Sequence, residues 1–188
     1  MNEIINIFST PIYIKKLNIN LNKLKLFAEN IERKNNKRVI SNEGGFQSND
    51  LDNKQEEVQE LIEELNKNVE IFKKVFNIEN IKLDNLWANI NYYGNYNTLH
   101  CHIDSLISGV FYVQTKKDSG AIEFVNDFET IEYHLQKIKD KEYNIYNSSK
   151  YFVVPEDNLL ILFPSWLKHR VKPNLTEDKR MSFSFNYN

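Results

Sequence analysis

The chain has 188 residues, a formal net charge of −2 and 27% charged residues, which argues against a broad basic surface for nucleic acid or for an anionic membrane. Cys101 is the only cysteine, so the chain cannot form an internal disulfide, and its cysteine content is compatible with a reducing compartment. No segment approaches the ~20 apolar residues of a membrane span. We therefore expect a cytoplasmic protein whose partners are small molecules, with neither nucleic acid nor membrane among them.

The N-terminal part of the chain predicts one strand and two helices. A loose alternation of apolar residues over 4–17, broken at Thr10-Pro11, predicts a strand interrupted by a turn. Asn20 is the predicted cap of a first helix, whose apolar stripe continues to Ile31. Apolar residues at helical spacing predict a second helix over Glu56–Phe76. Between the helices, residues 41–50 are predicted to form an ordered loop, a plain connector by its residues alone.

After the second helix the pattern changes to period two, with β-branched and aromatic residues. It predicts strands over 83–93, 106–114, 121–126, 150–154, 158–163, 168–172 and 180–187. Two helices followed by short strands predict a mainly β protein with N-terminal helices, in which a double-layered barrel carries the helices on one outer face. We expect a single domain over residues 1–188, with a strand and helix buttress over 1–80 and the barrel over 81–188.

A polar insertion at residues 127–149 interrupts the predicted strands. Its position between strands suits a lid or substrate loop, and a solvated connector explains it equally well. His134, within it, is expected to be an exposed surface histidine rather than a metal ligand. A homodimer formed through this insertion, or through an exposed strand edge, is also compatible with the sequence.

The centre of the chain carries a pattern typical of a metal site. His100, His102 and Asp104 stand at alternate positions, which on an extended backbone places all three side chains on one face. Two histidines and one carboxylate with open coordination positions are typical of non-haem Fe(II) oxygenases. A solvated strand end with polar side chains is the alternative interpretation of the same residues.

Two later residues complete a plausible pocket. His169 is the candidate for a further metal ligand, because a barrel brings distant strands together. Arg180 and Ser182 share a face of the last predicted strand. The planar guanidinium suits a carboxylate, and the hydroxyl adds a donor. The combination predicts a dicarboxylate pocket beside a metal.

At this point the chain resembles the 2-oxoglutarate and Fe(II)-dependent dioxygenase superfamily, and within it a family of small 2-oxoglutarate-Fe(II) oxygenases of marine bacteria and phages. The resemblance spans nearly the whole chain, in order. The matching segments are Phe-Ser-Thr-Pro-Ile-Tyr (8–13), Ser-Asn-Glu-Gly-Gly-Phe-Gln-Ser (41–48), Trp-Ala-Asn-Ile-Asn (87–91), His-Cys-His (100–102), Ser-Gly-Val-Phe-Tyr-Val (108–113), Leu-Phe-Pro-Ser-Trp-Leu-Lys-His (162–169) and Arg-Met-Ser-Phe-Ser-Phe-Asn (180–186).

The resemblance implies a double-stranded β-helix, the cupin-like jelly-roll core of that superfamily, and gives weight to the glycines in the 41–50 loop. It leaves two ligand sets open. The narrower family favours His100, His102 and His169, whereas the His-x-Asp of the broader superfamily favours His102, Asp104 and His169. In the first set, which we prefer, Asp104 remains an alternative third ligand or an acceptor that fixes an imidazole tautomer.

The resemblance also implies the cofactor and co-substrates. Fe(II), 2-oxoglutarate and O2 are expected, with succinate and CO2 released as an unidentified substrate is hydroxylated. Arg180 and Ser182, with Tyr112 or Tyr92, are the expected contacts of the distal carboxylate. The rival interpretation is a cupin-like metal-binding or ligand-binding module without redox turnover. Arg180 and Ser182 distinguish the two, because a simple binder has no need of a dicarboxylate anchor.

Overall fold

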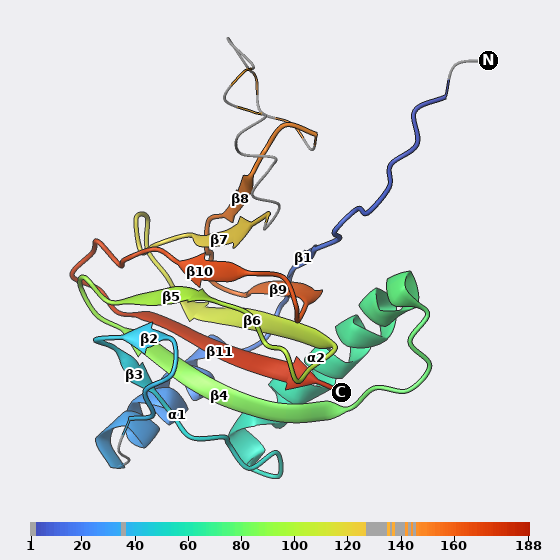
Figure 1. Ribbon diagram of the computed structural model, residues 1–188. Helices are drawn as coiled ribbons and strands as arrows, with labels where there is room; N and C mark the ends of the chain where they lie inside the picture. The colour runs from blue at the N-terminus through green and yellow to red at the C-terminus, as the bar shows by residue number, and fades with distance from the viewer. Residues whose placement is uncertain are drawn as a thin grey trace.

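The computed structural model describes residues 3–34, 37–126, 135, 137, 142, 144 and 146–188 (Figure 1). Its elements in chain order are β1 (Tyr13–Lys16), α1 (Leu21–Lys34), β2 (Asn42–Glu43), β3 (Phe46–Gln47), α2 (Glu56–Phe72), the 3-10 helix η1 (Lys73–Phe76), β4 (Leu83–Asn91), β5 (Tyr96–His100), β6 (Ile107–Gln114), β7 (Ile122–Val125), β8 (Lys150–Val153), β9 (Leu159–Pro164), β10 (His169–Val171) and β11 (Arg180–Tyr187).

The strands form two antiparallel sheets. One has the order β1-β9-β6-β11-β4-β3 and the other β2-β5-β10-β7-β8. From β4 to β7, and again from β8 to β11, successive strands alternate between the sheets, so the chain winds as a double-stranded β-helix (Figure 1). This confirms the prediction of a mainly β, jelly-roll fold with N-terminal helices.

The last strand shows how the period of two builds both a core and a cavity. Met181, Phe183 and Phe185 belong to the apolar cluster that the two helices cover. The intervening residues, which begin with Arg180 and Ser182, point to the opposite face, toward the second sheet. One face of β11 therefore stabilises the fold, and the other supplies polar groups to the space between the sheets.

Both helices pack their apolar stripes against the outer face of the six-stranded sheet (Figure 1). The predicted cap of α1 is present, because the Asn20 side-chain oxygen accepts a hydrogen bond from the backbone N–H of Asn22 at 3.0 Å. The second helix ends one turn earlier than predicted, and η1 continues it. Asn77, in a left-handed conformation, ends η1.

Three predictions about strands are wrong in part. Residues 4–17 contain only β1, and Ile4 and Phe8 are exposed, because no strand among the described residues pairs with the chain before Tyr13. The predicted loop at 41–50 contains β2 and β3, which belong to different sheets and so connect them. The prediction also missed β5, whose sequence of mostly polar residues lacks an apolar alternation.

The insertion predicted at 127–149 lies largely outside the described residues, as does His134. Within the described residues, no helix is long and apolar enough to cross a lipid bilayer.

Candidate metal and co-substrate site

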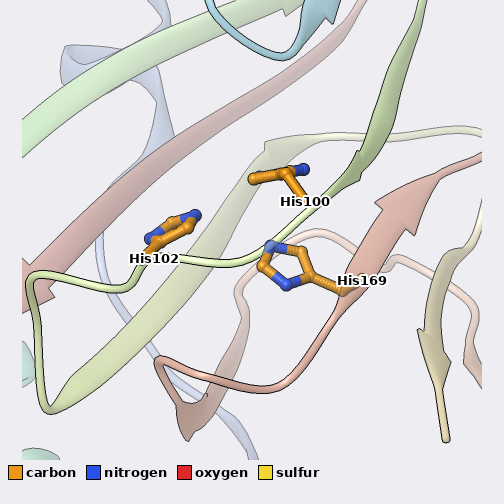
Figure 2. A group of neighbouring side chains, drawn as sticks. All are labelled: His100, His102 and His169. Carbon is orange, nitrogen blue, oxygen red and sulfur yellow. The ribbon is translucent and has the colours of Figure 1, made fainter. Parts of the chain in front are cut away.

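Three imidazoles meet between the two sheets. His100 is the last residue of β5 and His169 the first of β10, and the two are register partners. His102 follows β5 by two residues, where its backbone N–H donates to the carbonyl of Ser165 at 2.8 Å. One ring nitrogen of each histidine lies within 4.8 Å of the other two, and Figure 2 shows the side chains converging. This spacing suits three ligands of one metal ion.

Each imidazole is held through Nδ1. That nitrogen lies 2.7 Å from the Thr98 carbonyl oxygen in His100 and 2.9 Å from the Leu167 carbonyl oxygen in His169. In His102 it lies 2.6 Å from the side-chain oxygen of Asn186. Since an oxygen of this kind accepts and does not donate, Nδ1 carries the proton in each ring. The lone pairs are then on the three Nε2 atoms, which are free to bind a metal.

Burial keeps the cluster neutral. Desolvation lowers the pKa of His100 and of His102, and it holds the pKa of His169, which is 4% exposed, well below its ordinary value. The positive charge of neighbouring imidazoles would lower the pKa of His102 and His169 further. Metal binding requires deprotonated imidazole, so these shifts keep the site ready for a metal at neutral pH.

Arg180 lies in the same cavity as the imidazoles and is 1% exposed. Its Nη1 donates to the backbone carbonyls of Ser119 at 2.5 Å and Lys172 at 3.0 Å, with a longer contact to Gly120. These bonds fix the guanidinium at the cavity wall. Burial lowers its pKa to about 10, so the group remains charged at neutral pH.

Two buried donors in this wall have no hydrogen-bond partner among the described residues. They are Nη2 of Arg180 and the hydroxyl of Tyr112, which is itself 1% exposed. Both residues line the cavity, and the charge of Arg180 acts on Tyr112. Burial raises the pKa of Tyr112 to about 12, so its hydroxyl keeps its proton at neutral pH. An unsatisfied buried donor is costly, and a bound carboxylate would satisfy both.

The structure does not bring every predicted residue to this site. Asp104 lies in an exposed turn, outside the histidine cluster, and its backbone carbonyl accepts from the Asn188 side chain at 2.8 Å. Tyr92 is 41% exposed, outside the cavity lining, and its hydroxyl donates to the Glu32 carboxylate at 2.9 Å. For Asp104 the strand ends at His100, so the alternation that predicted its direction no longer applies. Tyr92, which the resemblance implied, follows the end of β4 at Asn91. Ser182, by contrast, does line the cavity.

The sequence analysis missed several polar groups in the cavity wall. These are Ser41, Asn89, Asn91 and Asn97, whereas Ser184 shares the predicted strand face of Arg180 and Ser182 and also lines the cavity. Asn89 and Asn91 alternate along β4 with the residues that face the helices, so the period of two in that strand was the available signal. Among the described residues that line the cavity, Arg180 carries a charge and none is acidic. The cavity therefore favours anionic and polar ligands.

Comparison with known families gives one match. Residues 85–186, more than half of the chain, match the model of a family described as "Putative 2OG-Fe(II) oxygenase". The matched range contains the three clustered histidines, Tyr112 and Arg180. No curated protein sequence matches the chain significantly.

Solved structures share the fold at low sequence identity. A prolyl-4-hydroxylase from Pseudomonas putida superposes with a TM-score of 0.63 at 13% identity, covering 95% of this chain and 93% of that one. HygX from Streptomyces hygroscopicus, with nickel and 2-oxoglutarate bound, gives 0.64 at 12% identity, with 95% and 83% covered. The viral collagen prolyl hydroxylase of Paramecium Bursaria Chlorella virus-1, in complex with 2-oxoglutarate, gives 0.60 at 12% identity, with 93% and 95% covered.

Proposed function

We propose, from the premise that the chain belongs to the 2-oxoglutarate-Fe(II) oxygenase family, that His100, His102 and His169 hold its iron and that Arg180 and Tyr112 hold its 2-oxoglutarate. As a member of this family the protein is an oxidoreductase that uses Fe(II), 2-oxoglutarate and O2. When bound, iron and 2-oxoglutarate supply the oxidising chemistry and release succinate and CO2. The residues of the chain bind, orient and shield these groups.

The proposed iron ligands fit a divalent first-row metal. Imidazole suits iron among other metals of this group, and three ligands leave coordination positions for a chelating keto acid and for O2. The hydrogen bonds at Nδ1 orient each ring before the metal arrives, which lowers the cost of assembling the site. Asp104 is not part of the proposed ligand set.

The pair of unpartnered donors is the observation that carries the proposal. Nη2 of Arg180 and the Tyr112 hydroxyl are buried in the wall of the cavity that also holds the imidazoles. A ligand that satisfies both while it reaches the metal needs a distal carboxylate and a metal-binding end. That description fits 2-oxoglutarate, and Ser182 offers a further hydroxyl beside it.

We further propose that the primary substrate is polar and that it is hydroxylated. The remaining lining offers amide and hydroxyl groups at Ser41, Asn89, Asn91 and Asn97. Such groups pair with hydrogen-bonding substituents and would be left unpaired by a purely apolar substrate.

A pair of keto acids tests the co-substrate site. 2-Oxobutanoate can chelate the metal as 2-oxoglutarate does but lacks the distal carboxylate. In protein loaded with Ni(II), 2-oxoglutarate should bind roughly 100-fold more tightly in a calorimetric titration, since a hydrogen bond to a charged group contributes about 1.5–3 kcal/mol. Arg180→Met should reduce this preference to about 10-fold, the part that the Tyr112 hydroxyl supplies, and leave 2-oxobutanoate affinity unchanged. A preference that stays near 100-fold in Arg180→Met would contradict the proposal.

A further inference from the structure

One of the three imidazoles is held differently from the others. His100 and His169 donate to main-chain carbonyls two residues before them, and those oxygens can only accept. His102 instead donates to a side-chain amide, that of Asn186. An amide presents an acceptor at one end and a donor at the other. The tautomer of His102 therefore depends on which way the Asn186 amide is turned.

Neighbouring strands fix the Asn186 amide. Asn186 on β11 has Asn85 on β4 and Ser108 on β6 as register partners, so the three side chains form a row across the sheet. Nδ2 of Asn186 donates to Oδ1 of Asn85 at 2.9 Å, which turns Oδ1 of Asn186 toward His102. The Ser108 hydroxyl donates to the same Oδ1 at 2.7 Å.

The orientation of Asn85 has its own cause. A β-bulge places Asp84 opposite no residue of β11, because Asn186 pairs with Asn85 and Tyr187 pairs with Leu83. Nδ2 of Asn85 donates to Oδ2 of Asp84 at 3.3 Å. An ionised carboxylate can only accept, so the NH2 end of Asn85 faces Asp84 and its oxygen faces Asn186.

We propose that Asp84, Asn85 and Asn186 form a relay of hydrogen-bond direction that sets the tautomer of His102 and so leaves its Nε2 free for the metal. Asn85 and Asn186 are positioning residues in this relay. With both amides reversed, the NH2 group of Asn186 would face Nδ1 of His102. The imidazole proton would then sit on Nε2, where it blocks coordination.

The Ser108 hydroxyl has two acceptors within reach and donates to the nearer one. The Ser108 hydroxyl also lies 3.0 Å from Nδ1 of His102, and donation in that direction would favour the opposite tautomer. Ser108 has a single proton, and Oδ1 of Asn186 is nearer, at 2.7 Å. The Ser165 hydroxyl oxygen lies 2.7 Å from the Ser108 hydroxyl oxygen and can donate a hydrogen bond to it, while Ser108 donates its own proton to Asn186. Ser108→Ala should therefore leave the tautomer of His102 unchanged.

The relay rests on the proposed function only in taking His102 as a metal ligand. Its direct test uses metal-free protein labelled with 15N at histidine, because NMR distinguishes a protonated Nδ1 from a protonated Nε2. His102 should carry its proton on Nδ1 in the native chain. Asn186→Leu should shift it toward Nε2, and Asn186→Asp, which keeps only acceptors, should restore the native tautomer.

Metal affinity gives an independent readout. Asn186→Leu should weaken Ni(II) binding by roughly 10- to 100-fold, the range expected when a hydrogen bond that orients a ligand is lost. Asn85→Leu should weaken it less, and Asn85→Asp should keep native affinity. Asn66→Ala is the matched control, because it removes an amide bonded to Tyr187, the next residue of β11, and leaves the relay intact. It should change neither readout.

Two results would overturn the relay. The first is a native tautomer and native Ni(II) affinity in Asn186→Leu. The second is a folded Asn186→Asp variant that loses affinity as much as Asn186→Leu, which would indicate a packing role. Neither measurement involves 2-oxoglutarate. If 2-oxoglutarate shows no preference over 2-oxobutanoate but Asn186→Leu shifts the tautomer of His102, the proposed co-substrate site is rejected and the relay stands. If the keto-acid preference is present but Asn186→Leu keeps the native tautomer and native Ni(II) affinity, the relay is rejected and the co-substrate site stands.

Discussion

His100 and His169 are register partners on β5 and β10, and their ring centroids lie 4.3 Å apart. The pairing of two strands therefore fixes the distance between two of the proposed ligands. The third, His102, lies beyond the end of β5 and depends on Ser165 and Asn186 for its position. We expect the pair to be robust and His102 to be the ligand that nearby substitutions disturb most.

The first prediction concerns which residues retain iron. His169→Ala should abolish iron retention after anaerobic loading and desalting, because it removes one of three ligands. Asp104→Asn is the matched control and should retain one iron per chain, since Asp104 lies in an exposed turn outside the cluster. Unchanged iron in His169→Ala, or lost iron in Asp104→Asn, would reject the proposed ligand set.

The second prediction separates binding from stability at Tyr112. Its buried hydroxyl has no partner among the described residues, so Tyr112→Phe should leave the free energy of unfolding unchanged or raise it by about 1 kcal/mol. The same variant should bind 2-oxoglutarate roughly 10-fold more weakly, through loss of one hydrogen bond to a carboxylate. Urea denaturation and calorimetry check the two effects. A destabilised variant with native 2-oxoglutarate affinity would mean that the hydroxyl serves the fold.

The third prediction concerns the loop that holds Arg180. Gly120 has a φ of +91°, and a Cβ there would clash with the Lys172 carbonyl and approach Nη1 of Arg180 to 2.5 Å. Gly120→Ala should therefore destabilise the protein by more than ~2 kcal/mol and weaken 2-oxoglutarate binding. Gly94 also has a positive φ, +78°, but a Cβ there meets nothing within 4 Å.

Gly94→Ala is thus the matched control for Gly120→Ala, because it carries the backbone penalty of about 1 kcal/mol without the clash. Its 2-oxoglutarate affinity should be native. Equal losses of stability in the two variants would show that the clashes with the Lys172 carbonyl and Arg180 cost nothing.

The fourth prediction concerns pH. Burial lowers the pKa of His100, His102 and His169 in the folded, metal-free protein, whereas in the unfolded chain these groups take up protons near their ordinary value of 6.5. The unfolded state therefore binds more protons as the pH falls below about 6.5, and stability is lost from there down through the lowered pKa values. Above that pH the three groups are neutral in both states and contribute no slope.

Urea denaturation in chelator at several pH values measures this effect. Each imidazole can contribute up to about 1.4 kcal/mol per pH unit. His169→Gln, which removes the most strongly shifted imidazole, should flatten the decline in stability between pH 6.5 and pH 5. A decline as steep as that of the native chain would contradict the assigned cause.

The architecture was predictable wherever the period of two runs without interruption. In β11, apolar residues alternate with Arg180 and Ser182, and the strand and both of its faces follow from that pattern. The convergence of distant histidines was expected from a closed barrel, and the resemblance of the motifs supplied the choice of fold. Tyr112, which the resemblance implied as a contact of the distal carboxylate, lines the cavity from β6.

The parity argument fails where a strand ends. Asp104 was assigned a direction on an extended backbone, but β5 ends at His100. The role that we propose for Asn186 does not follow from strand parity either, because it depends on the bulge at Asp84 and on the direction of an amide. Both features arise from the way neighbouring strands pair, and the residue pattern of a single strand does not predict them.

The most direct test of the proposed iron and co-substrate site is an anaerobic titration of the metal-free protein with Fe(II) and then 2-oxoglutarate, followed by visible absorption. We expect one iron per chain and a metal-to-ligand charge-transfer band that appears on adding 2-oxoglutarate. The iron should be lost in His169→Ala, and the 2-oxoglutarate requirement should rise in Tyr112→Phe. Iron that binds without producing the band would contradict the proposed function, and the chain would then be a metal-binding jelly roll without this co-substrate.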